Sequence, residues 1–356
     1  MILGAGGPAG VNVLKSLQSA DEPIELYGSD MNPYHVEYFR PLVKGAYLVP
    51  RCTAPNYIDE INDIIEKNGI EVIHPQPDIE VKILSEHREK FKAKCLLPSK
   101  DTVRICQDKF LSSEQWTKKG FQTVKSIILR DEHLEEDIER AFSELGPNLW
   151  IRATQGAGGT GSTPANSKDI IIHWIKYWRS RAENWTFIAQ ENLTGRNVAF
   201  QSLWYKGELI VSQARERVEY IYPYLAPSGI TGTPTVAKTI HDETVNKMAT
   251  EAVLAIDENA TGIFCVDIKF DARGNPMPTE INVGRFFTTS YFFSHAGKTY
   301  NRWYANMPYL VVKLANGESI DTKNIPKYNI LPENLYWIRH IDCGHHLVEE
   351  SKLEKR

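Results

Sequence analysis

Asp267, Glu280 and Asn282 have the residue types and the spacing of a site for a hard metal ion. Glu280 and Asn282 are two residues apart, so the period of a β-strand places both side chains on one face. Asp267 joins them if its own strand pairs with theirs in register. Oxygen ligands on one sheet face suit Mg²⁺, which proteins hold with one or two carboxylates while substrate phosphates complete the shell. A solvated polar face is an equally good interpretation of these three residues alone.

A β-hairpin must position these three side chains. Residues 263–270 and 277–283 are rich in β-branched and aromatic residues and predict two strands. The intervening sequence DARGN, 271–275, has the composition of a tight turn, in which Gly274 can adopt a positive φ. The segment 262–285 is therefore predicted to be a hairpin with polar side chains on one face.

A second segment, 148–162, has the composition of an anion-binding loop. Its sequence NLWIRATQGAGGTGS predicts a strand at 149–153, which carries the cation Arg152, followed by a loop rich in glycine. Glycine-rich backbone offers N–H groups to an anion without side-chain obstruction. No Gly-Lys-Ser/Thr sequence closes the loop, so it is not a P-loop. We interpret it as a phosphate lid, with a flexible surface loop as the alternative.

The N-terminal sequence MILGAGGPAG predicts a strand, a glycine turn and a helix. Residues 4–9 match the dinucleotide-binding pattern G-x-G-x-x-G with the allowed alanine at the last position. A second strand is expected at 24–29, and Asp30 follows it in the place of a ribose-binding acid. An NAD(P)-dependent oxidoreductase is therefore one candidate. Glycines at such a turn can also serve close packing alone.

The rest of the N-terminal part alternates between strand and helix patterns. Further strands are predicted at 46–50, 70–74 and 95–98, and helices at 57–68 and 79–91. This alternation indicates a parallel sheet with helices on both faces. We expect this first domain to end near Ile105.

Composition excludes several classes of protein. The 356 residues suggest two or three domains, and the formal charge of −4 disfavours binding to nucleic acid or to an anionic membrane. No apolar run approaches the length of about 20 residues that spans a bilayer, and the N-terminus does not resemble a signal peptide. The five cysteines are scattered without a C-x-x-C pair, which predicts a cytoplasmic protein with neither disulfides nor a zinc ribbon.

Several other charged residues remain ambiguous. Lys109, at the start of a predicted helix, is on its own best interpreted as a surface lysine. Arg215, Arg217 and Arg285 could form a carboxylate-binding corner, and Arg215 and Arg217 could equally belong to an ion-paired strand edge. The histidines and cysteine of the tail 334–348 are better explained by an additional strand than by a second metal site.

The order of these parts resembles the ATP-grasp superfamily, and within it the ligases that are similar to the large subunit of carbamoyl-phosphate synthetase. The resemblance rests on GAGGPAG, on Asp108-Lys109, on the Arg152–glycine loop, on Gln190-Glu191-Asn192-Leu193-Thr194-Gly195-Arg196, and on the Glu280-Ile281-Asn282 strand. It implies an α/β and α+β protein in which a Rossmann-like pre-ATP-grasp domain precedes a two-lobed ATP-grasp fold. The implied division is 1–105 for the first domain, 106–188 for the small lobe with the lid, 189–325 for the large lobe with the metal site, and 326–356 for a C-terminal extension.

The resemblance also implies roles for individual residues. Arg285 and Lys109 would be catalytic. The nucleotide would be bound by Lys109, Arg152, Gly156, Gly158, Gly159, Thr160, Gly161, Ser162, Glu191, Asn192, Leu193 and Asn197, and the metal by Asp267, Glu280 and Asn282. Relatives usually have glutamate where Asn197 stands, and Arg285 lies one residue further from Asn282 than in the usual Asn-Pro-Arg.

The activity that the resemblance implies is ATP-dependent ligation of a carboxylate to an amine. An acyl phosphate would be the intermediate, and ADP and phosphate the other products, with Mg²⁺ or Mn²⁺ as the metal. The partners would be a small carboxylate and a small amine, with neither nucleic acid nor membrane, and a homodimer is possible. A non-catalytic ATP-binding regulator, permitted by Asn197, is the third candidate beside the ligase and the oxidoreductase.

Overall fold

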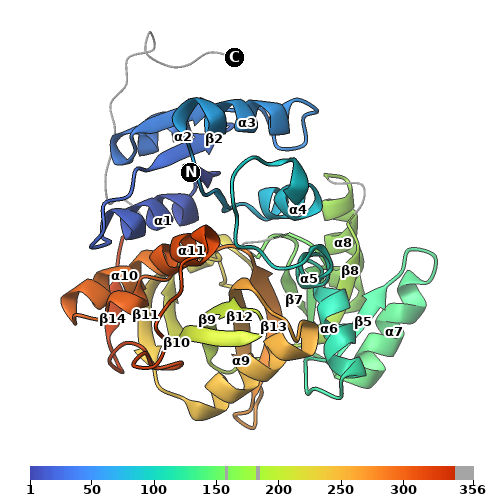
Figure 1. Cartoon of the computed structure of the whole chain (residues 1–356). Helices are drawn as coiled ribbons and strands as arrows, with labels where there is room; N and C mark the ends of the chain where they lie inside the picture. The colour runs from blue at the N-terminus through green and yellow to red at the C-terminus, as the bar shows by residue number, and fades with distance from the viewer. Residues whose placement is uncertain (157–158, 182–184, 341–356) are drawn as a thin grey trace.

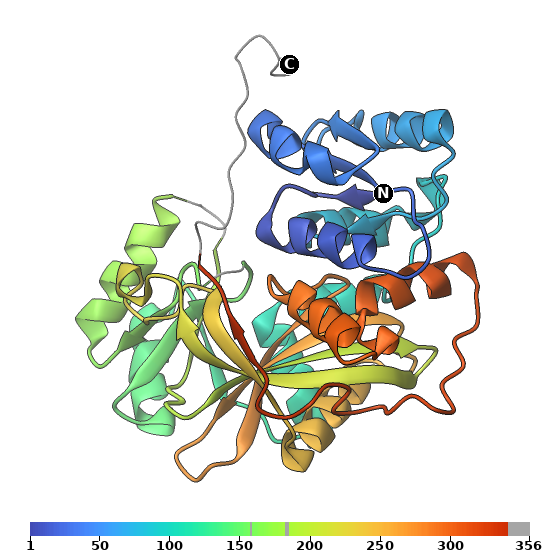
Figure 2. The same ribbon diagram turned by 90° about the vertical axis from the view of Figure 1, so that its left-hand side faces the viewer.

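The computed structural model describes residues 1–156, 159–181 and 185–340. It contains one parallel and two antiparallel sheets, each in its own part of the chain (Figure 1). The parallel-sheet domain lies above the other two, and Figure 2 shows the N-terminal helices stacked over the C-terminal helices of the large lobe. The mixed α/β and α+β fold class is confirmed. The residue boundaries of the domains stay a prediction.

The N-terminal domain is a four-stranded parallel sheet with the order β3-β2-β1-β4. Its strands are β1 (Ile2–Leu3), β2 (Tyr27–Asp30), β3 (Gly45–Leu48) and β4 (His74–Pro75), and its helices are α1 (Pro8–Gln18), α2 (Pro33–Phe39), α3 (Tyr57–Asn68) and α4 (Asp78–Glu86). Helix α3 ends at Gly69, whose φ of 62° provides the left-handed cap that the Asn68-Gly69 sequence predicts. The parallel sheet and the helices between its strands confirm the Rossmann-like arrangement.

The predicted strand at 95–98 is wrong. This segment forms no regular ladder, and only a single bridge between Val72 and Lys94 precedes it. The carbonyl oxygens of Leu97 and Pro98 instead accept hydrogen bonds from the guanidinium of Arg88, at 3.3 and 2.5 Å. The Arg88 side chain thus donates the hydrogen bonds that these carbonyl groups would accept from a neighbouring strand.

The glycine turn after β1 is used for close packing. A Cβ atom on Gly6 would lie 2.2 Å from the Cβ of His35, and one on Gly10 would lie 2.6 Å from the carbonyl oxygen of Gly4. The carboxylate of Asp30 accepts hydrogen bonds from the backbone N–H groups of Gly6 (3.1 Å) and Asn32 (3.0 Å). These contacts favour the packing interpretation of the motif, because Asp30 already holds the turn itself.

The small lobe is a four-stranded antiparallel sheet with the order β5-β8-β6-β7. Its strands are β5 (Ser126–Leu129), β6 (Leu149–Ala153), β7 (Thr163–Ala165) and β8 (Phe187–Glu191). Helices α7 (Leu134–Leu145) and α8 (Lys168–Arg179) pack on it around a shared apolar cluster. Two short helices, α5 (Lys100–Cys106) and α6 (Lys109–Lys118), connect this lobe to the N-terminal domain.

The large lobe is a six-stranded antiparallel sheet with the order β13-β12-β9-β10-β11-β14. Its strands are β9 (Asn197–Tyr205), β10 (Glu208–Tyr220), β11 (Pro234–Ile240), β12 (Gly262–Phe270), β13 (Pro276–Val283) and β14 (Tyr336–Ile338). Helix α9 (Glu243–Ile256) covers one face. Helices α10 (Ser290–Thr299) and α11 (Met307–Asn316) cover part of the other and pack against α1. Strand β10 continues as far as Tyr220, so Arg215 and Arg217 lie within the sheet.

The central hairpin is formed by β12 and β13, as predicted. In its turn, Oδ1 of Asp271 accepts hydrogen bonds from the backbone N–H groups of Arg273 and Asn275, and Gly274 has a φ of 84°. The local sequence therefore determines this turn.

The predicted tail strand is present but short. Strand β14 pairs antiparallel with β11, and Trp337 stacks on Phe292 with ring centroids 5.3 Å apart. Residues 341–348, including His345 and His346, lie outside the described residues. None of the helices in the described part of the chain has both the length and the apolar character needed to cross a lipid bilayer.

Candidate active site between the two antiparallel sheets

The hairpin brings Asp267, Glu280 and Asn282 together. Asp267 is directly opposite Glu280 in the β12–β13 ladder, and Nδ2 of Asn282 donates to Oδ2 of Asp267 at 3.4 Å. A register shift follows Asp267, where Thr279 is the additional residue, and its hydroxyl donates to the carbonyl oxygen of Asp267 at 3.0 Å. Such bulges re-aim side chains beside functional sites.

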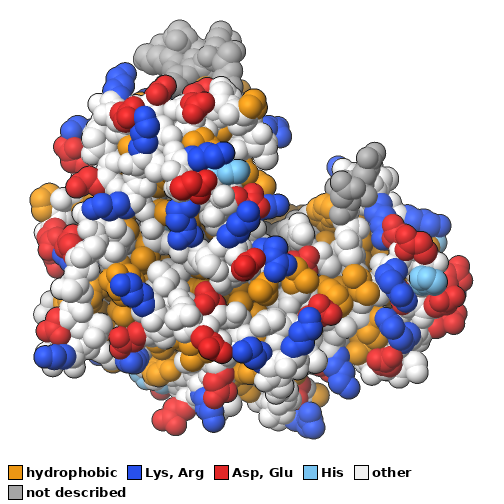
Figure 3. Space-filling view, turned by 45° about the vertical axis from the view of Figure 1, so that its right-hand side comes forward, with side chains coloured by type: hydrophobic (Ala, Val, Ile, Leu, Met, Phe, Trp, Pro, Cys, Tyr) orange, Lys and Arg blue, Asp and Glu red, His pale blue; other side chains and the backbone are white. Residues whose placement is uncertain are grey.

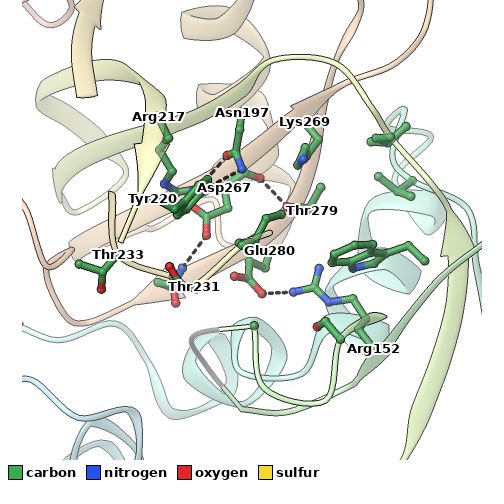
Figure 4. Close-up of a pocket in the computed structure, with 18 of the residues that line it drawn as sticks. Arg152, Asn197, Arg217, Tyr220, Thr231, Thr233, Asp267, Lys269, Thr279 and Glu280 are labelled. Carbon is green, nitrogen blue, oxygen red and sulfur yellow. Dashed lines mark hydrogen bonds and ion pairs between the residues drawn. The ribbon is translucent and has the colours of Figure 1, made fainter. Parts of the chain in front are cut away.

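Each carboxylate is paired with a cation from another element. Glu280 forms ion pairs with Arg152 of β6 (2.5 Å) and with Lys109 of α6 (3.5 Å), as Figure 4 shows for Arg152. Asp267 forms an ion pair with Arg217 of β10 at 2.5 Å. Burial opposes ionisation of Glu280, yet Arg152 and Lys109 together hold the pKa of its carboxyl below the usual range. Burial raises the pKa of Asp267, with Arg217 opposing this effect.

Lys109 is a buried residue of the site, so the surface interpretation is wrong. Asp108 caps α6 by accepting hydrogen bonds from two backbone N–H groups of its first turn, which fixes Lys109 at the first helical position. Lys109 is 7% exposed, and its Nζ donates to the carbonyl oxygen of Gly156 at 2.8 Å. Burial lowers the pKa of this lysine, and Glu280 acts in the opposite direction.

The glycine loop lies over this charge cluster and contacts both lobes. Gly156, Gly159 and Gly161 have φ values of 102°, 76° and 75°, which other residues rarely adopt. A Cβ on Gly159 would lie 2.8 Å from the carbonyl oxygen of Ile230 in the large lobe, and one on Gly161 would lie 2.7 Å from the Trp185 ring. Thr160 is exposed and Ser162 is buried, while Gly158 lies outside the described residues.

A cavity of about 430 Å³ separates the two antiparallel sheets. This size is within the range of small-molecule sites. In Figure 3 the surface is hollowed between the N-terminal domain and the lobe at its right, with basic and acidic side chains around the hollow. The predicted residues that line the cavity are Arg152, Gly159, Ser162, Glu191, Asn192, Leu193, Asn197, Asp267, Glu280, Asn282 and Arg285. Lys109, Gly156, Thr160 and Gly161 are not among the lining residues; Lys109 reaches the site through its ion pair with Glu280.

Asn197 is engaged within the protein. Its Nδ2 donates to the hydroxyl of Tyr220 at 2.5 Å, and its Oδ1 accepts a hydrogen bond from Arg217 at 2.9 Å. Arg217 also pairs with Asp267, so Asn197 belongs to the network that positions the β12–β13 hairpin. A nucleotide ribose would compete with these contacts.

Arg285 lies at the junction with the N-terminal domain. Gly284 has a φ of 71°, and this left-handed turn accommodates the additional residue after Asn282. The guanidinium of Arg285 then returns to Oδ1 of Asn282 (2.5 Å) and forms an ion pair with Asp78 of α4. Burial alone would lower the pKa of Arg285, but Asp78 raises it.

Trp150, Lys269 and Tyr220 are among the lining residues that the sequence predictions missed. Trp150 and Lys269 line the cavity from the same strand faces as Arg152 and Asp267. Each is two residues from a predicted site residue, so the strand period could have identified it. Tyr220 could not have been found in this way, because the irregular segment after it gives no strand pattern.

The residues at the hairpin fit a magnesium ion. Two half-buried carboxylates and an amide share one sheet face, and Mg²⁺ prefers such oxygen ligands. No group of three or more His, Cys, Asp or Glu side chains that could hold a metal occurs in the described ranges. The donor set therefore leaves positions to be completed by phosphate oxygens and water, as is usual for Mg²⁺ rather than for zinc.

Comparison with known proteins agrees with this architecture. Residues 2–97 match the family model described as "PylC-like, N-terminal domain". A chloroplastic biotin carboxylase from Populus trichocarpa is 25% identical over 214 residues, which is 57% of this chain and 38% of that protein. A second one is 24% identical over 60% of this chain and 41% of its own length. The matched region thus spans about two fifths of the length of these relatives.

Solved structures extend the likeness over nearly the whole chain. Carboxyaminoimidazole ribonucleotide synthase from Aspergillus clavatus, complexed with ATP, matches 90% of this chain and 78% of its own with a TM-score of 0.65 and 16% identity. The biotin carboxylase domain of Hydrogenobacter thermophilus 2-oxoglutarate carboxylase, complexed with MgADP, ADP and bicarbonate, matches 94% and 72% with a TM-score of 0.67 and 17% identity. These neighbours are ATP-grasp ligases, so the predicted ATP-grasp fold is confirmed.

Proposed function

We propose that this chain is an ATP- and Mg²⁺-dependent ligase that joins a carboxylate to an amine through an acyl phosphate. The observation that carries the proposal is the convergence of Lys109 and Arg152, from the small lobe, on the carboxylate of Glu280 in the large lobe. Two cations and two carboxylates meet beneath a glycine loop at the edge of one cavity. Phosphoryl transfer needs this combination of positioning and charge neutralisation, and little covalent chemistry from the protein.

Each residue has a definite task in this mechanism. Lys109 and Arg152 neutralise the phosphate oxygens of ATP, and they exchange their contacts with Glu280 for the nucleotide. Adenine is bound at the end of the cavity that Glu191, Asn192 and Leu193 line. Asp267, Glu280 and Asn282 would hold the metal, which would supply charge neutralisation for the phosphates; Mn²⁺ could take the place of Mg²⁺. Arg285 orients the carboxylate that receives the phosphoryl group.

The cavity walls protect a reactive product. An acyl phosphate is lost to water unless the site excludes it until the amine arrives. The glycine loop approaches the large lobe beside the cavity, where a Cβ on Gly159 would lie 2.8 Å from the carbonyl oxygen of Ile230. We further propose a cytoplasmic location, as the cysteine usage predicts, and retain the homodimer as a prediction.

An ADP-release screen tests the proposed function. Purified protein with MgATP is offered pairs of carboxylates and amines, and products are identified by mass spectrometry. ADP release that requires both substrates, with a condensed product, is the expected result. ATP binding without turnover across a broad panel would favour the non-catalytic regulator, and NAD(P) binding without ATP binding would favour the oxidoreductase.

A further inference from the structure

Arg215 is a buried cation, and two of its nitrogens have no hydrogen-bond acceptor in the described part of the chain. It is 1% exposed, lies on β10 and lines the cavity. Its Nε and Nη1 atoms are both buried without a partner among the described residues. A buried charge without a partner is costly, so proteins rarely keep one without a reason.

The other arginines that line the cavity differ from Arg215 in this respect. Arg152 pairs with Glu280, Arg217 with Asp267, and Arg285 with Asp78. Arg215 lies over the Phe287 ring, with its guanidinium carbon 5.0 Å from the ring centroid. Burial, followed by the nearby Arg217, lowers the pKa of Arg215 to about 9, so it is still charged at neutral pH. Asp267, the acid that acts most on the pKa of Arg215, is itself paired with Arg217, so no described carboxylate forms an ion pair with Arg215.

The sheet register places Arg215 apart from the metal ligands. Arg215 on β10 and Asp267 on β12 are both opposite Ala199 of β9, which lies between them. Glu280 on β13 is opposite Asp267 on the far side. Two strand spacings thus separate the backbones of Arg215 and Asp267, which is about 10 Å. Only the small side chain of Ala199 lies between them in this row. An anion at Arg215 would be bound beside the reacting groups and not among them.

We propose that Arg215 binds a second, non-reacting anionic group, a carboxylate or a phosphate, on one of the two small-molecule substrates. This inference rests on the proposed function, since it takes the cavity to be the substrate site. It implies that simple monocarboxylic acids and uncharged amines are poor substrates. Amino acids, dicarboxylates and phosphorylated amines are the classes that satisfy Arg215.

Direct binding tests the proposal without turnover. Acetate, malonate, succinate, glutarate and inorganic phosphate are titrated calorimetrically into the full chain and into Arg215→Met, Arg215→Lys and Arg196→Met. Arg196→Met is a matched control, because Arg196 lies 4.9 Å over the Phe270 ring but does not line the cavity. We expect a dicarboxylate or phosphate to bind wild type and Arg196→Met more tightly than acetate does, and to bind Arg215→Met about 10- to 100-fold more weakly. Tighter binding of a dicarboxylate than of phosphate would identify the anionic group as a carboxylate, and the reverse order would identify it as a phosphate.

Arg215→Lys keeps the test decisive if Arg215→Met does not fold. Lysine retains the charge but lacks the planar fork, so binding about tenfold weaker than in wild type is expected. Equal affinity of all variants for every anion, or no binding of any of them to wild type, would overturn the proposal. If anion binding depends on Arg215 but the protein releases no ADP, the proposed ligase function is contradicted and the role of Arg215 is not. If the protein releases ADP and Arg215→Met has an unchanged kcat/KM, the role of Arg215 is contradicted and the ligase function is not.

Discussion

Arg285 and Asp78 form an ion pair that joins the end of the β12–β13 hairpin of the large lobe to the first turn of α4 in the N-terminal domain. The same guanidinium donates to Oδ1 of Asn282, a predicted metal ligand. The N-terminal domain therefore helps to position the site although it lies outside the two ATP-grasp lobes.

Asp78→Asn should lower kcat/KM by about tenfold, because loss of one charged hydrogen-bond partner costs roughly 1.5 to 3 kcal/mol and some of it is recovered by the amide. Asp59→Asn is the control, since it also removes an acid from the first turn of a helix but Asp59 lies outside the cavity lining. The measurement is steady-state ADP release. Equal activity of Asp78→Asn and wild type would show that the pair does not position Arg285.

Gly284→Ala should destabilise the protein more than Gly274→Ala, although both glycines have positive φ. The left-handed backbone costs an alanine roughly 1 to 2 kcal/mol at either position. A Cβ on Gly284 would also lie 2.8 Å from Cγ1 of Val81, whereas nothing lies within 4 Å of one on Gly274. We expect an additional loss of about 1 to 3 kcal/mol for Gly284→Ala in urea unfolding. Since Gly284 directs Arg285, kcat/KM should fall in this variant and not in Gly274→Ala.

Local sequence patterns could predict much of the site. The strand period placed Glu280 and Asn282 on one face, and the turn sequence DARGN paired their strand with that of Asp267. Glycine spacing after Arg152 predicted the loop over the charge cluster. These features depend on residues close in the chain, where elementary geometry is sufficient.

Contacts between distant segments could not be predicted in this way. The partners of Lys109 are Gly156 and Glu280, and nothing near position 109 indicates that its ammonium is buried. The prediction of a strand at 95–98 was wrong because Arg88 donates hydrogen bonds to the carbonyl groups of this segment. That Nε and Nη1 of Arg215 have no acceptor among the described residues is likewise visible only after the sheet is assembled.

Glu280→Gln should abolish ADP release while the protein still folds. The amide keeps the shape but loses a metal ligand and the counter-charge of two cations, so a fall of about 10³-fold or more is expected. Glu216→Gln is a matched control: Glu216 pairs with Arg196 and Lys238 and is 20% exposed, against 21% for Glu280, but it does not line the cavity. Circular dichroism checks folding of both variants. Turnover that persists in folded Glu280→Gln would contradict the metal assignment.

The contribution of Glu80 to stability should fall as the pH rises between about 5 and 8. Burial raises the pKa of Glu80 to about 8, against the hydrogen bond from Tyr57 that favours its ionised form. The unfolded chain loses this proton near the ordinary value, while the folded protein keeps it until the higher pH. At Glu80 the folded state therefore binds more protons in this range, and the contribution of this group to the free energy of unfolding drops by up to about 1.4 kcal/mol per pH unit.

Urea unfolding at pH 5.5 and 7.5 measures this dependence, and Glu80→Gln should weaken it, since the amide imitates the protonated acid at both values. Asp137→Asn is the control of opposite sign. Hydrogen bonds from Arg130 lower the pKa of Asp137 to about 2, so its contribution is complete above its ordinary value and is lost only at lower pH. Asp137→Asn should therefore be destabilised equally at both pH values and keep the wild-type slope. An unchanged slope in Glu80→Gln would mean that Glu80 is already ionised at pH 5.5, and that the fold tolerates a buried carboxylate beside Tyr57.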